Sequence, residues 1–150
     1  MAQTINAETA TTQDNGGDTW LGRNVVLNWE IIIYVLIFLL AIFSRFYMLG
    51  DRVMSHDESL HTVFSNNLYK DGIYRHNPMM HGPILFHVTA ASYALFGVDD
   101  FTSRIYPALL GVLMVMFPLL LRRWLGRTGA ILTAIMLLLS PLLLYYARYI

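Results

Sequence analysis

The residues best suited to chemistry are two neighbouring acids, Asp57 and Glu58. Ser55 precedes Glu58 by three positions, which is the spacing of a capping box at the start of a helix. Because the helix macrodipole stabilises a carboxylate in the first turn, we expect Asp57 to be ionised. Such a carboxylate can act as a general base toward a hydroxyl group, or the Asp57/Glu58 pair can hold a divalent cation. The plainer interpretation gives both acids a capping role only.

Histidines are the next potential ligands, and all of them fall between Gly50 and Phe101. They are His56, His61, His76, His81 and His87. The first two are five residues apart, which separates them by about 140° around a helix, so a metal site made of histidines alone is not expected. His87 lies in an apolar stretch and could ligate a haem or a chlorin, but a single histidine favours a hydrogen-bonded structural role.

Five of the nine arginines fall into two groups. Arg104 and Arg148 stand at the ends of apolar stretches, where a guanidinium group can bind a lipid phosphate or a diphosphate leaving group. Ordinary anchoring to lipid headgroups explains a single arginine at this depth as well. Arg122, Arg123 and Arg127 form a basic turn, which we interpret as a determinant of membrane topology and not as a binding site.

The composition indicates a membrane protein. The chain has 150 residues, of which 56% are hydrophobic and 13% are charged, and its mean hydropathy is +0.50. Soluble domains carry about 25% charged residues, so a free-standing soluble enzyme is not expected. Ten basic residues balance ten acidic ones, which argues against a nucleic-acid partner. The absence of cysteine excludes disulfides, thiolate chemistry and zinc sites built on sulfur.

Three segments are apolar and long enough to cross a bilayer. The first has an unbroken apolar run from Ile31 to Phe43, and Arg45 near its end is expected to snorkel to the interface. The third contains Ser140-Pro141 at its middle. We therefore predict an all-α integral membrane protein with three transmembrane helices and an extracytoplasmic loop that carries two amphipathic or interfacial helices. The predicted spans are about 26–47, 104–122 and 129–147, and the loop is 50–102.

The two loop helices are predicted from different signals. The first begins at the Ser55 capping box, ends at Asp71-Gly72 and has one apolar face at helical spacing. That face consists of Leu60, Val63, Phe64 and Leu68. The second, Pro83–Phe96, is short for a span, so we expect it to lie at the interface. Three spans also place the 122–127 turn and Arg23 on one, cytoplasmic side, as the positive-inside rule prefers.

Two regions of different character divide the chain. Residues 1–24 form a polar tail that we expect to become ordered only against a partner, and 25–150 form the membrane module. We expect a multi-pass protein of the cell membrane, with the tail and the Arg122–Arg127 turn cytoplasmic and the loop 50–102 extracytoplasmic. The expected partners are membrane lipids and other membrane-protein subunits.

Six short motifs along the chain carry a resemblance to a known family. In chain order they are Met54-Ser55-His56-Asp57-Glu58-Ser59, Gly72-Ile73-Tyr74-Arg75-His76-Asn77-Pro78, His81-Gly82-Pro83-Ile84-Leu85, Leu95-Phe96-Gly97, Phe101-Thr102-Ser103-Arg104, and Ser140-Pro141 followed by Tyr145-Tyr146-Ala147-Arg148. Their order and spacing over about 26–150 resemble the N-terminal part of GT-C superfamily membrane glycosyltransferases. The nearest branch is that of the protein O-mannosyltransferases and aminoarabinose transferases, including the flippase-associated N-glycosylation type.

The resemblance implies an activity and roles for particular residues. Asp57 would be the catalytic base with Glu58 in support, and Arg104, Arg148 and His81 would face a polyisoprenyl-phosphate sugar. A phosphate leaving group needs little protonation, so one base and cationic groups could suffice for an inverting transfer. The family's enzymes have many more spans, so this stretch is expected not to be catalytic alone.

An alternative function is that of an accessory structural transmembrane subunit of a multi-subunit membrane complex, for example an electron-transfer complex. Small residues in the second and third spans would let partner helices approach closely.

Overall fold

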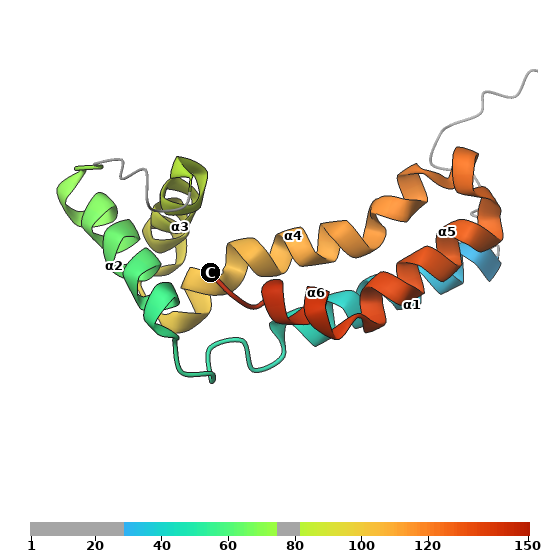
Figure 1. Cartoon of the computed structure of the whole chain (residues 1–150), viewed down its shortest axis with the longest axis horizontal. Helices are drawn as coiled ribbons and strands as arrows, with labels where there is room; N and C mark the ends of the chain where they lie inside the picture. Colours follow the sequence, from blue (N-terminus) through green and yellow to red (C-terminus); the bar gives the residue numbers. More distant parts are fainter. Residues whose placement is uncertain (1–28, 75–81) are drawn as a thin grey trace, which may run out of the picture.

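The computed structural model describes residues 29–74 and 82–150, and over these residues every regular element is an α-helix (Figure 1). The predicted tail and His81 lie outside the described residues. The helices are α1 (Trp29–Phe46), α2 (His56–Asp71), α3 (Pro83–Phe96), α4 (Asp100–Leu120), α5 (Arg122–Leu139) and α6 (Pro141–Tyr146).

The long helices α1 and α4 run antiparallel along the molecule's long axis (Figure 1). At one end, the Glu30 carboxylate of α1 pairs with Arg122, directly after α4, and at the other the rings of Phe46 and Phe101 lie 6.4 Å apart. Among the described residues, α1 and α4 are the two helices that are long and apolar enough to cross a membrane. At 1.5 Å per residue α4 is roughly 31 Å long, close to the thickness of a bilayer core.

The prediction of a third continuous span at 129–147 is wrong. The segment is divided at Ser140, whose ψ of 116° is not helical, so α5 ends at Leu139 and α6 begins at Pro141. The proline causes the break, because its ring disfavours helical backbone in the residue before it. Gly126, with φ 71° and ψ 171°, adds a second kink among the arginines at the start of α5.

Small and β-branched side chains bring α1, α4 and α5 together. The core consists of Ile37, Ala41, Val112, Val115 and Ala134. Ala108 and Ala130 are also fully buried. The small residues predicted to admit partner helices therefore pack, in large part, the chain's own helices against each other, which is how helices associate in lipid.

Arg45 also differs from its predicted role. It is fully buried and does not extend to a membrane surface. Its guanidinium donates hydrogen bonds to the Ser44 hydroxyl (2.7 Å) and the Leu137 carbonyl of α5 (3.4 Å). The return of the chain through α5 covers the end of α1 and closes the route that the side chain would need for snorkelling.

Helices α2 and α3 lie side by side at one end of the long helices (Figure 1). The predicted signals at the ends of α2 are confirmed, with Ser55 as the N-cap of a complete capping box and Gly72 as a left-handed C-cap at φ 65°. Helix α3 has the predicted bounds. The buried face of α2 is not the apolar one, however, and consists of Glu58, His61 and Ser65. Of its apolar stripe, Leu60, Val63 and Phe64 are exposed and Leu68 is half-buried.

Candidate functional site

The capping box at the start of α2 sends the two neighbouring acids in different directions. The Ser55 backbone N–H donates to Glu58 Oε2 (2.9 Å), and the Glu58 backbone N–H donates to the Ser55 hydroxyl (3.4 Å). This reciprocal pair folds the Glu58 side chain back over the helix start, where it is fully buried. Asp57 points away and is exposed.

Two arginines neutralise the buried Glu58 carboxylate. Arg104 Nε lies 3.2 Å from Glu58 Oε1, with both side chains fully buried, and Arg52 Nη2 lies 2.7 Å from Oε2. Arg104 Nη1 also donates to the backbone carbonyls of Leu49 (3.0 Å) and Arg52 (2.9 Å). The cluster therefore joins the start of α2, the start of α4 and the connection after α1.

The end of the chain closes over this cluster. The Ile150 N–H donates to Glu58 Oε1 (3.4 Å), and the Ser55 hydroxyl donates to the Tyr149 hydroxyl (2.9 Å). The Arg52 guanidinium carbon lies 5.2 Å from the ring centroid of Tyr145 and 5.5 Å from that of Tyr149, within cation–π range. Residues 145–150 thus help to enclose the Glu58 carboxylate, while the Arg52 side chain stays 38% exposed.

The electrostatics of the cluster keep Glu58 ionised. Burial by itself raises the pKa of the Glu58 carboxyl, because it disfavours the charge. The Ser55 N–H, the Arg104 hydrogen bond and the positive charges of Arg104 and Arg52 outweigh burial, so the pKa lies below its ordinary value. An acid held this way is suited to fixing geometry and not to exchanging protons.

Asp57 has the opposite surroundings. Within the described part of the chain it has no hydrogen-bond or ion-pair partner, and its side chain is open to solvent. It occupies the first turn of α2. Of the two acids, only Asp57 is free to accept a proton from a bound molecule.

Arg148 and Arg104 do not converge on one open site. Arg148 Nη2 donates to the backbone carbonyls of Tyr47 and Met48, at 2.9 Å each, and so satisfies the C-terminal end of α1. Met48 adopts φ 50°, a left-handed conformation that these two bonds hold in place. Both arginines predicted to bind phosphate therefore have structural partners in the chain itself.

The described residues place no metal-binding cluster around these acids, since no group of three or more His, Cys, Asp or Glu side chains lies together among them. The Glu58 oxygens at the predicted Asp57/Glu58 cation site are held by Arg52 and Arg104. His87 is exposed, and its Nδ1–H donates to the Pro83 carbonyl (2.8 Å), while its ring lies 4.9 Å from that of Tyr74.

Arg52 and Tyr149 belong to the cluster although no sequence motif included them, and Tyr145 belongs to it although the sequence motif that contains it predicted no contact with Arg52. An arginine shortly before a capping-box acid was the one available signal for Arg52. The tyrosines gave none, because their contact with Arg52 depends on the return of the chain through α5 and α6. The chain matches no protein-family model, no curated protein and no solved structure.

Proposed function

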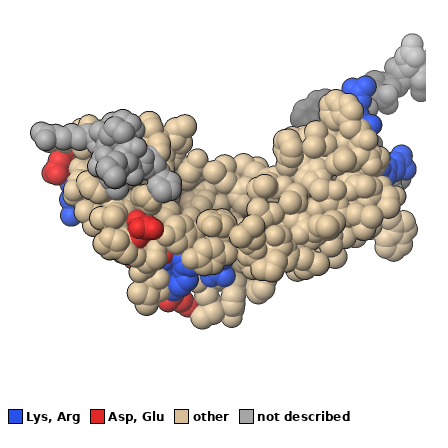
Figure 2. All heavy atoms as spheres, in the orientation of Figure 1, with Lys and Arg blue, Asp and Glu red and all other residues tan. Residues whose placement is uncertain are grey.

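We propose that this chain is a membrane-embedded module of a GT-C-like glycosyltransferase that uses a polyisoprenyl-phosphate sugar, with Asp57 as the general base. The proposal includes a multi-pass protein of the cell membrane with the Asp57 end extracytoplasmic. Two apolar helices support membrane insertion, and the middle of the face in Figure 2 is free of charged side chains. The chain acts with further membrane subunits and is not catalytic alone.

The different surroundings of Asp57 and Glu58 carry this proposal. A structural acid that is buried between two arginines holds the start of α2, and its exposed neighbour has no hydrogen-bond or ion-pair partner among the residues that the structure describes. A capping role alone requires only Glu58, whose side chain completes the capping box. The position of Asp57 in the first turn of α2, outside the two apolar candidate spans, suits a reaction between a lipid-borne donor and a polar acceptor.

One base is sufficient for the proposed sugar transfer. Asp57 takes the proton from an acceptor hydroxyl as its oxygen bonds to the anomeric carbon of the sugar. The bond from that carbon to the phosphate oxygen breaks, and the electron pair leaves with the phosphate. Arg104 acts through Glu58 as a positioning residue. Arg52, whose side chain is 38% exposed, and Arg148 use Nη2 for their structural partners, and we assign their remaining N–H groups to the leaving phosphate.

Replacement of Asp57 tests the proposal. Asp57→Asn should lower transfer by the full assembly about 10²–10⁴-fold, because the amide cannot accept the proton. Asp71→Asn, at the exposed far end of the same helix, is the matched control and should leave turnover unchanged. Turnover of the Asp57→Asn assembly at the level of the control would contradict the assignment.

The second candidate function, an accessory structural subunit, is favoured by the exposed apolar face of α2. Leu60, Val63 and Phe64 are 37%, 54% and 43% exposed, outside the two candidate spans. If docking is the main role, Leu60→Ser/Phe64→Ser should release the chain from its complex, while Asp57→Asn should change nothing. Retention of the double variant in the complex would count against this candidate.

A further inference from the structure

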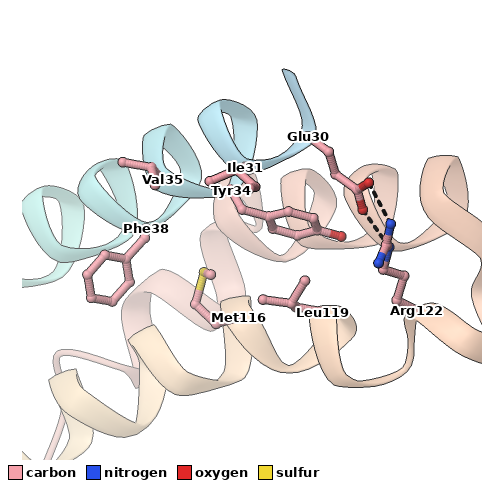
Figure 3. Close-up of a pocket in the computed structure, with 8 residues that line it drawn as sticks. All are labelled: Glu30, Ile31, Tyr34, Val35, Phe38, Met116, Leu119 and Arg122. Carbon is pink, nitrogen blue, oxygen red and sulfur yellow. Dashed lines mark hydrogen bonds and ion pairs between the residues drawn. The ribbon is translucent and has the colours of Figure 1, made fainter. Parts of the chain in front are cut away.

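A groove of about 480 Å³ lies between the start of α1 and the end of α4 (Figure 3). Ile31, Val35 and Phe38 line it from α1, and Met116 and Leu119 line it from α4. These side chains are apolar, and the groove is open along one side, so a flexible hydrocarbon chain could lie in it.

One end of the groove is polar. Glu30 pairs there with Arg122, at 2.5 Å between Oε1 and Nε and 2.7 Å between Oε2 and Nη2. Figure 3 shows the Tyr34 hydroxyl pointing along the groove toward this pair. Tyr34 is 6% exposed, and its hydroxyl has no hydrogen-bond partner within the described residues. A buried hydroxyl without a partner is costly, so a ligand oxygen at this position would be favourable.

A second hollow of about 460 Å³ adjoins the groove and shares Leu119 and Arg122 with it. Arg123, Gly126 and Arg127 complete most of its lining. The kink at Gly126 gathers three arginines around this space. Among the described residues, Glu30 is the only acid in the lining of either hollow, and its Oε2 lies 3.7 Å from Arg127 Nε. Three guanidinium groups against one carboxylate leave a surplus of positive charge.

We propose that the two hollows together bind one anionic phospholipid. The phosphate lies among Arg122, Arg123 and Arg127, and one acyl chain occupies the apolar groove. The Tyr34 hydroxyl then donates a hydrogen bond to a glycerol-ester oxygen between the two parts. Arginine binds phosphate oxygens in a bidentate manner, and a free phosphate ion would leave both the groove and the hydroxyl unused.

This site rests on the proposed membrane insertion but not on the proposed chemistry of Asp57. Native mass spectrometry of the full chain with phosphatidylglycerol and phosphatidylcholine of identical acyl chains tests it without any measurement of turnover. We expect several-fold more bound phosphatidylglycerol than phosphatidylcholine, with one tightly held molecule per chain. Equal retention of the two lipids would overturn the proposal.

Different variants test the headgroup part and the acyl-chain part of the lipid site. Arg123→Gln/Arg127→Gln should remove the preference for the anionic lipid, and Tyr34→Phe should weaken retention of both lipids. Lys70→Gln, at the exposed end of α2, removes one charge elsewhere and should change neither. An unchanged preference in the double arginine variant would refute the headgroup assignment. Release of the lipid by inorganic phosphate would refute the role of the groove.

Discussion

Glu58 stabilises the fold because it makes two kinds of contact at once. Its position at the third residue of α2 lets it complete the capping box, and the same carboxylate accepts hydrogen bonds from Arg52 and Arg104. Removal of one partner from a buried ion pair leaves the other charge uncompensated, which is more destabilising than the loss of an exposed pair. The structure therefore predicts different consequences for replacement of the two neighbouring acids, Asp57 and Glu58.

Replacement of Glu58 by Gln should lower the stability of the folded chain at neutral pH by roughly 3–5 kcal/mol, because Arg104 is left buried without its counter-charge. Asp57→Asn and Asp71→Asn, both at exposed positions, should stay within about 0.5 kcal/mol of the unmodified chain. Unfolding followed in detergent by circular dichroism measures the difference. A stability of Glu58→Gln equal to that of Asp57→Asn would show that the ion pairs contribute little.

The depressed pKa of Glu58 also predicts a dependence on pH. The stabilisation is fully present above the pKa of an unfolded glutamate, about 4.3, and is lost as pH falls through the lower folded value. Unfolding temperatures measured from pH 6 down to pH 3 should thus fall more steeply for the unmodified chain than for Glu58→Gln. Parallel curves for the two proteins would contradict the direction of the shift.

At the scale of the elements, the approach of α6 to α4 depends on Gly111. A Cβ atom at this position would collide with the Cβ of Ala147 and would lie 3.4 Å from Arg45 Nε. Gly129, in contrast, has room for a Cβ, since the nearest atom is 3.5 Å away. The two glycines therefore form a matched pair in which only one permits a larger residue.

Gly111→Ala should cost about 1–3 kcal/mol of stability, as overpacking of a filled contact usually does. Gly129→Ala should be neutral or stabilising by up to about 1 kcal/mol, because alanine is the better helix former. Thermal unfolding of the two variants in the same detergent makes the comparison. A Gly111→Ala variant as stable as Gly129→Ala would mean that α6 does not pack closely on α4.

Helix ends that depend on neighbouring residues were predicted correctly from the sequence. The Ser55–Glu58 spacing predicted the start of α2, Asp71-Gly72 predicted its end, and the predicted segment Pro83–Phe96 matches α3, because caps and turns depend on neighbouring residues. The pairing of Glu58 with Arg104 joins residues 46 positions apart and depends on how α2 docks against α4. No periodic pattern in the sequence carries that information.

The burial of Arg45 and the break in the third predicted span also could not be predicted from the sequence. Apolar composition indicated a membrane segment at 129–147 but did not show that the Ser140-Pro141 step ends one helix and begins another. From composition alone, an arginine at the end of a span is expected to extend to the membrane surface. In the structure, α5 packs beside α1 and encloses Arg45. Both differences arise from how helices pack.

At the scale of the whole molecule, charge is separated along the long axis. Figure 2 shows Asp, Glu, Lys and Arg side chains over the part of the visible face near α2 and at the opposite end, with a stretch free of them in between. The α2 end carries the Glu58 cluster and Asp57, and the opposite end carries the arginines around Gly126. If the apolar middle lies in a bilayer, the base proposed for sugar transfer and the proposed lipid site face opposite sides of the membrane.

The accessibility of two single cysteines tests this arrangement most directly, because the chain has no cysteine of its own. Asn67, exposed on α2, and Thr128, exposed beside the arginine turn, mark the two ends. In sealed vesicles, an impermeant thiol reagent added outside should label only one of Asn67→Cys and Thr128→Cys, and permeabilisation should expose the other. Labelling of both variants from the same side would contradict the membrane-crossing arrangement on which the proposed function depends.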